Sequence, residues 1–123
     1  SVMKVYSFEK LECWQHARQL AVWTYKATKD FPSEEKFGII SQMRRASVSV
    51  ASNIAEGKSR GTDPDFKRFL LIAFGSGAEL ETQLVISFKL GYIDEALYTR
   101  VTLQLTEVMK MLNAFIIKLN ASR

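Results

Sequence analysis

Apolar residues recur at three- and four-residue steps through most of the chain, which predicts long helices and no strands. The most informative stretch is residues 42–57, which combines an expected buried stripe with an unusually small second surface. The stripe is Met43, Ala46, Ser47, Val50 and Ile54, and the small residues are Ser49, Ala51, Ser52 and Ala55. Small side chains allow a second helix backbone to come close, so this surface is expected to meet another helix.

The pattern predicts helices over residues 10–28, 37–56, 64–90 and 94–119, after an extended lead-in over residues 1–8. Gly57 and Gly91 are expected to end the second and third helices in the left-handed conformation. Thr62 or Asp63 is expected to cap the third helix and Asp94 the fourth. Short connections imply antiparallel neighbours, so the expected fold is all-α, an up-down-up-down four-helix bundle forming one domain over residues 1–123.

The third predicted helix is apolar on two sides. One stripe consists of Phe66, Phe69, Leu70, Ala73, Gly77, Leu80, Leu84 and Phe88, and the second of Leu71, Ile72, Gly75, Ala78, Thr82, Val85 and Ile86. A four-helix chain of this length has one core, so the second stripe is expected to meet another subunit. Glycine inside a helix costs about 1 kcal/mol relative to alanine, and close backbone contact at Gly75 and Gly77 is a compensation. The sequence therefore predicts a homo-oligomer with its interface at Leu71, Ile72, Gly75, Ala78, Thr82 and Ile86.

The composition is that of an ordinary globular protein, with 47% hydrophobic and 24% charged residues. The net charge of +4 is compatible with a polyanionic partner but does not require one. No run of eighteen apolar residues and no secretory cleavage pattern is visible, so we expect a cytoplasmic chain that spans no membrane.

Cations gather between residues 44 and 68, where six of them face three acids. Five are candidates for contacts with RNA or DNA phosphates: Arg45, Lys58, Arg60, Lys67 and Arg68. The competing interpretation is an ordinary solvated surface. A polar strip on the second helix (Arg45, Ser49, Ser52, Asn53 and Glu56) is likewise either solvated or a hydrogen-bonding surface between helices.

Arg44, Glu79 and Glu81 are charged residues on otherwise apolar faces. We expect the arginine to pair with the carboxylates and to fix the register of the helices. The alternative, two carboxylates acting as general acid and base, requires a cleft that the sequence does not reveal.

Nothing in the sequence predicts catalysis or a cofactor. His16 is the one histidine and is expected at the surface, and no Glu-x-x-His pair is present to hold a di-metal centre. The glycine spacings match no nucleotide-binding loop, and no base can be assigned to any serine. Cys13, the one cysteine, is expected to be a small half-buried residue and not a reactive thiol. We therefore expect a protein that is not an enzyme.

Several motifs resemble the bacterial four-helix bundle family of proteins encoded by intervening sequences in large-subunit ribosomal RNA genes. That family includes the accessory variability protein of diversity-generating retroelements. The matching segments are residues 11–14 with Ala17, 42–46, 52–57, 69–70, 73, 75–76, 78–80 and 90–93, among which Ser52, Asn53, Glu56, Gly57 and Ser76 carry the family motif. The resemblance implies a homopentamer with a central opening, no catalytic activity, and a basic surface that in the retroelement branch contacts nucleic acid and the reverse transcriptase.

Two functional hypotheses follow. The first is a non-catalytic, oligomeric nucleic-acid-binding or accessory protein. The second is a protein-interaction scaffold without physiological nucleic-acid binding.

Overall fold

The computed structural model describes residues 8–121, and the chain is all-α within them. The four long helices are α1 (Glu12–Thr28), α2 (Ile39–Ser59), α3 (Asp63–Lys89) and α4 (Glu95–Ala121). Two short 3-10 helices, η1 (Phe8–Lys10) and η2 (Ser33–Glu35), precede α1 and α2. Of the expected lead-in over residues 1–8, only Phe8 lies inside the described residues, and its ring packs edge-on against Trp14.

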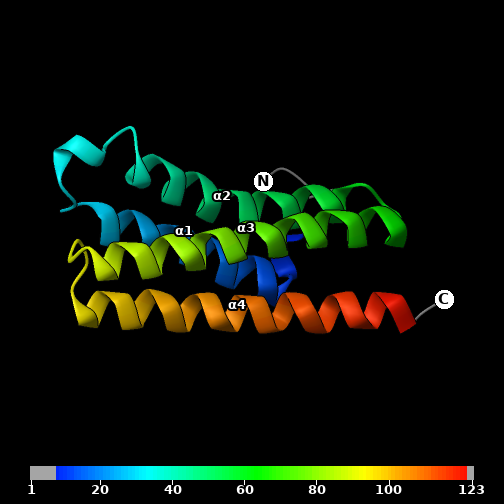
Figure 1. The fold of residues 1–123 in the computed structure, drawn as a ribbon. Coiled ribbons are helices and arrows are strands. Elements are labelled where there is room, and N and C mark those ends of the chain that lie inside the picture. The colour runs from blue at the N-terminus through cyan, green and yellow to red at the C-terminus, as the bar shows by residue number, and fades with distance from the viewer. Residues whose placement is uncertain (1–7, 122–123) are drawn as a thin grey trace, which may run out of the picture.

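Each helix runs back along the one before it (Figure 1). α1 packs against α2 and α4, and α3 packs against the same two helices from the other side. The α1–α2 and α3–α4 connections lie at one end of the molecule and the α2–α3 connection lies at the other (Figure 1). The expected four-helix bundle is confirmed.

Capping residues explain where α3 and α4 begin and where α3 ends. The Thr62 hydroxyl accepts a hydrogen bond from the Asp65 amide at 3.4 Å, and the Asp94 carboxylate accepts one from the Leu97 amide at 2.8 Å. Gly91 has a φ of +77° and donates to the Phe88 carbonyl, while the following amide of Tyr92 reaches Ser87. This pair of bonds is the Schellman motif, so Gly91 ends α3 as expected.

Gly57 does not end α2, which is a correction to the sequence prediction. The helix continues to Ser59, and Gly61 is the glycine with positive φ in this connection. Gly57 is buried against α3, where an added Cβ would lie 2.6 Å from the Phe69 Cβ and 3.3 Å from the Phe66 carbonyl oxygen. The glycine is therefore needed for the close approach of two helices and not for a turn.

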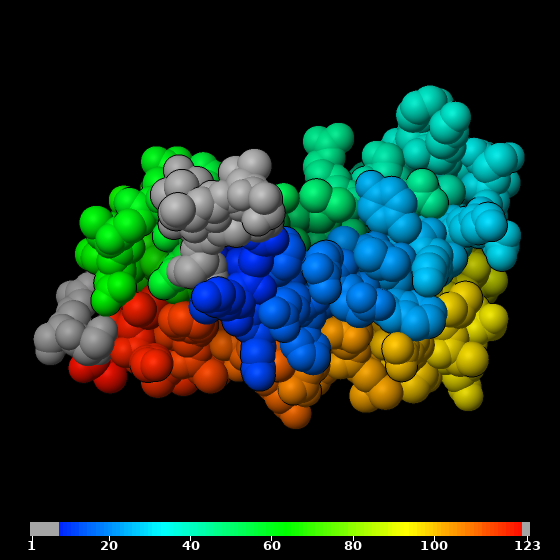
Figure 2. All heavy atoms as spheres, turned by 180° about the vertical axis from the view of Figure 1, so that it is seen from behind, coloured from blue at the N-terminus to red at the C-terminus, as the bar shows by residue number. Residues whose placement is uncertain are grey.

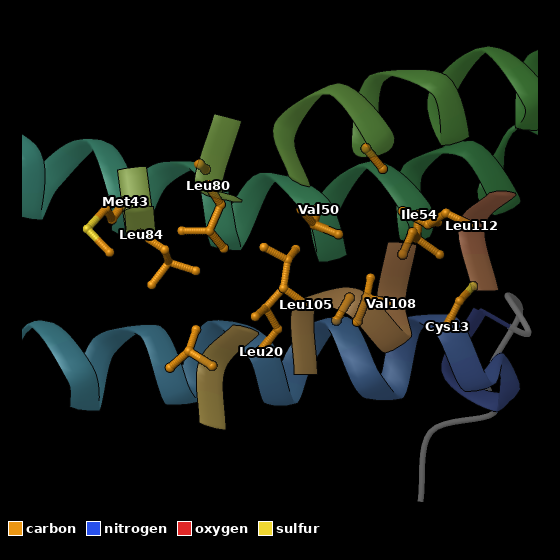
Figure 3. Packing of buried hydrophobic residues seen from close by; sticks show 14 of the residues in the cluster. Cys13, Leu20, Met43, Val50, Ile54, Leu80, Leu84, Leu105, Val108 and Leu112 are labelled. Atoms are coloured by element: carbon orange, nitrogen blue, oxygen red, sulfur yellow. The ribbon is translucent and has the colours of Figure 1, made fainter. Parts of the chain in front are cut away.

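One core runs the length of the bundle and draws on all four helices (Figure 3). Its fully buried side chains include Leu20 from α1, Met43 from α2, Leu80 from α3 and Leu105 from α4. The buried residues of α4 recur at steps of three and four: Val101, Leu105, Val108 and Leu112. Near the end of α4 the inward position shifts to Ile116, and Phe115 is only partly buried, against Phe66.

Candidate nucleic-acid interface and subunit-contact faces

Three cations of the α2–α3 turn lie over two phenylalanine rings. Arg60 and Arg68 both face the ring of Phe69, at 5.0 and 4.5 Å from its centroid, and Lys58 lies 5.6 Å from the centroid of Phe66. Both rings are buried at the α2–α3 contact, so the core itself orients these long side chains. The structure thus brings Lys58, Arg60 and Arg68 together at one end of the bundle.

We call Lys58, Arg60 and Arg68, together with Lys67 near the start of α3, the turn cluster. Acids partly neutralise it. The Arg60 guanidinium pairs with Glu56 at 2.8 Å, and Arg68 approaches Asp65 at 3.8 Å. Among the described residues, neither Lys58 nor Lys67 has an acidic partner within 4 Å. Exposed pairs of this kind contribute little stability, so these side chains remain available to an anionic partner.

Arg45 is not part of the turn cluster. It is exposed on α2 fifteen residues before Arg60, which places it roughly 22 Å away along the helix. The five predicted phosphate contacts therefore divide between the two ends of α2.

Arg44 does not pair with Glu79 or Glu81 within the chain. Its guanidinium donates to the Thr28 hydroxyl at 2.9 Å and lies 4.6 Å from the centroid of the Tyr25 ring. Both glutamates are exposed on α3. Arg44 thus joins α2 to α1, whereas the expectation had joined it to α3. A helical wheel shows on which face of its own helix a residue lies, but it does not show which other helix covers that face.

Part of the polar strip on α2 is a hydrogen-bonded contact with α3. The hydroxyls of Ser49 and Ser76 lie 2.9 Å apart, and the Asn53 amide donates to the Ser49 carbonyl and hydroxyl at 2.8 and 2.9 Å. Ser52, in contrast, is exposed and lines a groove on the α1 side. Motif residues Asn53, Gly57 and Ser76 therefore serve the α2–α3 contact.

The second apolar stripe of α3 is exposed in the single chain. Leu71 and Ile86 are 50% and 45% exposed, and a Cβ added at Gly75 would meet no atom within 4 Å. The other exposed members are Ile72, Ala78, Thr82 and Val85. We call this surface the α3 face. The single chain leaves it uncovered, and its contact with another subunit stays a prediction.

A groove of about 730 Å³ lies between α1 and α2, on the face shown in Figure 2. Its floor and walls are almost entirely apolar, and two cations lie at its rim, Arg18 and Lys26. The other lining residues are Phe8, Trp14, Ala21, Val22, Tyr25, Val48, Ala51, Ser52 and Ala55. We call it the α1–α2 groove. The sequence pattern does not predict this groove, although the small residues Ala51, Ser52 and Ala55 indicate a close contact there.

Among the described residues, α3 is the one helix long and apolar enough to cross a membrane by length and composition. Its most apolar 18-residue window has a mean hydropathy of 1.4, and 39% of that window is buried in the bundle. Core helices pass the same test, so the expectations of no membrane span and of a cytoplasmic location stay predictions.

The described residues offer no group of three or more side chains suited to a metal ion. The His16 ring contacts the Gln104 amide at 3.1 Å. Cys13 is 4% exposed, and burial raises the pKa of its thiol to about 11. This burial is deeper than the half-buried position that the sequence predicts, and a neutral thiol is a poor nucleophile.

We expect Cys13 to react slowly with a disulfide reagent in the folded protein. Raising the pKa from 9.0 to about 11 lowers the thiolate fraction at pH 8 about 100-fold. Because burial disfavours the anion, the rate should rise about tenfold per pH unit up to the raised pKa. The absorbance of released thionitrobenzoate measures it, and the unfolded chain in guanidinium is the control. Equal rates in the two states would contradict the assignment.

A family model for the "23S rRNA-intervening sequence protein" matches residues 9–114. A solved structure of a protein of unknown function from the S23 ribosomal protein family of Bacteroides thetaiotaomicron is also similar, with a TM-score of 0.78 and 27% sequence identity. The similarity covers 85% of this chain and 94% of that one. No curated protein matches the sequence. The family match extends from η1 to the last third of α4, and the chain belongs to the 23S rRNA-intervening sequence protein family.

Proposed function

We propose that this protein is a non-catalytic homo-oligomer that binds nucleic acid through the turn cluster. The observation that carries the proposal is the placement of Lys58, Arg60 and Arg68 over phenylalanine rings at one end of the bundle. The phenylalanine rings are fixed in the core and restrict the motion of the cationic side chains that lie over them. These side chains therefore lose less conformational entropy when they bind phosphate oxygens. Lys58 and Lys67, which lack acidic partners among the described residues, are the strongest contributors.

Assembly is supported by two apolar surfaces on opposite sides of the chain. The α3 face projects from α3, while the α1–α2 groove opens beside α1, the helix diagonal to α3. Contact between two different surfaces is heterologous, and it produces either a closed ring or an open filament. A ring of five subunits agrees with the family resemblance, and we propose it here.

Charge favours the groove of a second copy as the partner of the α3 face. Glu79 lies in that face, one turn after Gly75 and two turns before Ile86, and it is exposed. Arg18 and Lys26 at the groove rim are cations suited to this carboxylate. A carboxylate in lipid hydrocarbon would be costly, so a protein surface fits the α3 face better than a membrane does.

Binding to nucleic acid is tested by electrophoretic shift and by its dependence on salt. We expect wild-type protein to retard a duplex at about 50 mM salt, with affinity falling as salt rises. Removing two phosphate contacts with Lys58→Ala and Lys67→Ala should lower the slope of log K against log salt by about 1.8.

The matched control removes two exposed lysines away from the α2–α3 connection, Lys89→Ala at the end of α3 and Lys110→Ala on α4, and should leave the slope unchanged. Absence of binding at low salt, or an equal change in both double variants, would reject the turn cluster as the interface. Structured RNA run in parallel shows which nucleic acid binds more tightly.

The alternative is an interaction scaffold, and the apolar character of the α1–α2 groove favours it. If the chain belongs to the retroelement branch of the family that it resembles, the protein partner would be a reverse transcriptase. Recovery of a stoichiometric protein partner from cell extract after nuclease treatment would support the scaffold. Loss of all bound macromolecules after nuclease treatment would support nucleic-acid binding.

A further inference from the structure

Phe37 is the most exposed large hydrophobic side chain among the described residues, at 88%. It lies between η2 and α2, next to Lys36, and neighbouring Ile40 provides the buried anchor of this segment. Since the bundle gains almost no burial from this ring, the fold does not explain its presence. An exposed aromatic ring beside cations is the arrangement on which proteins stack unpaired bases, so the surroundings of Phe37 decide what it can bind.

Phe37 borders a shallow pocket of about 420 Å³ that is rich in cations. Its described lining residues include three cations and no acid: Tyr25, Lys36, Phe37, Ile40, Ser41, Arg44 and Arg45. The Lys36 ammonium lies 5.6 Å from the centre of the Phe37 ring. A second aromatic ring, Tyr25, is 45% exposed in the same pocket. We call this group the Phe37 pocket.

Glu35, the acid next to Lys36, and one of the three cations already have hydrogen-bond partners within the chain. The Glu35 carboxylate accepts a hydrogen bond from the Tyr92 hydroxyl at 3.0 Å and one from the Ile39 amide at 3.4 Å. Arg44 is held against Tyr25 and Thr28. The cations left free to meet an incoming anion are therefore Lys36 and Arg45.

We propose that the Phe37 pocket binds single-stranded nucleic acid, with an unpaired base stacked on Phe37 and the adjoining phosphates at Lys36 and Arg45. Every base has a face that stacks on an aromatic ring, and basic side chains beside such rings follow the backbone. An apolar protein segment would use the ring but would gain nothing from the cations. A duplex would use the cations but not the ring, because its bases already stack on one another.

This second site goes beyond the proposed function, because it lies at the opposite end of α2 from the turn cluster and selects unpaired bases. The α1–α2 connection that contains Phe37 and the α2–α3 connection lie at opposite ends of the bundle (Figure 1). A strand with a paired and an unpaired segment can then contact both sites. The inference rests on the proposed binding of nucleic acid, but it makes a separate prediction.

Fluorescence anisotropy with three labelled probes of matched charge tests the inference: a 12-mer of oligouridine, a duplex, and an abasic strand. Phe37→Ala should weaken oligouridine binding on the order of 5- to 100-fold and leave the duplex and abasic probes unchanged. Phe37→Trp should restore binding, because tryptophan also stacks. Leu103→Ala, which removes an exposed apolar side chain from α4, is the control and should change nothing.

Unchanged oligouridine binding by Phe37→Ala would overturn the inference, and so would an equal loss for the abasic strand. Light scattering on Phe37→Ala tests whether a second copy of the chain occupies the Phe37 pocket. A fall in particle mass would mean that Phe37 contacts a second copy, and this result would also overturn the inference. A wild-type protein that binds the duplex but not oligouridine would reject the Phe37 pocket and leave the turn cluster standing. Failure to bind any probe would reject both.

Discussion

Replacing Gly57 with alanine is expected to destabilise the fold by about 2–3 kcal/mol, although alanine is the better helix former. The new methyl group would lie 2.6 Å from the Phe69 Cβ and 3.2 Å from a Phe66 ring carbon. A Cβ is fixed to its backbone and cannot rotate away, so α2 and α3 would have to move apart along their contact. The gain in helix propensity, about 1 kcal/mol, does not offset this separation.

Urea unfolding followed by circular dichroism at a fixed chain concentration measures this effect. Gly77→Ala is the matched control, because it is the same change inside α3 but its new Cβ would meet the flexible end of Met109. That side chain can adopt another rotamer, so the control should stay within about 1 kcal/mol of wild type. A Gly57→Ala protein as stable as the wild type would show that the two helices tolerate wider spacing.

Gly57 also shows where prediction from the sequence stops. The periodicity of residues 42–57 correctly predicts a helix with a buried stripe, because that property depends on neighbours one or two turns away. Whether a glycine ends the helix or admits another backbone depends on Phe66 and Phe69, which meet it only after the chain has reversed. Gly91 was predicted correctly because its role is local, in the turn that it forms.

The candidate sites divide in the same way. Lys58, Arg60 and Arg68 flank one short turn, so proximity in sequence correctly indicated proximity in space. Arg45 belongs to the same charged segment of sequence, but the rigid length of α2 carries it to the other end of the bundle. The α1–α2 groove was not predicted because its walls come from segments about thirty residues apart. A local sequence pattern does not show which distant segments pack side by side.

The α3 face is expected to hold the subunits together, so Gly75→Leu should abolish assembly. We expect light scattering at micromolar concentration to give wild-type particles heavier than the 14.0 kDa chain and Gly75→Leu particles of chain mass. The bundle should remain folded, because no atom lies within 4 Å of the new Cβ in the single chain. Thr99→Leu, a leucine introduced on the exposed surface of α4, is the control and should keep the wild-type mass. A 14 kDa wild-type particle would refute assembly itself.

A second variant tests whether the contact joins two different surfaces. Val48→Glu places a carboxylate in the α1–α2 groove, where Val48 is 41% exposed, and should also give particles of chain mass. Each variant keeps one intact surface, so a mixture with Gly75→Leu should form a pair of about 28 kDa and nothing larger. If the α3 face instead met its own copy, the mixture would contain Val48→Glu pairs and unassembled Gly75→Leu chains, and mixing would add nothing. The mass of the mixture therefore separates a heterologous contact, which a ring requires, from a two-fold dimer.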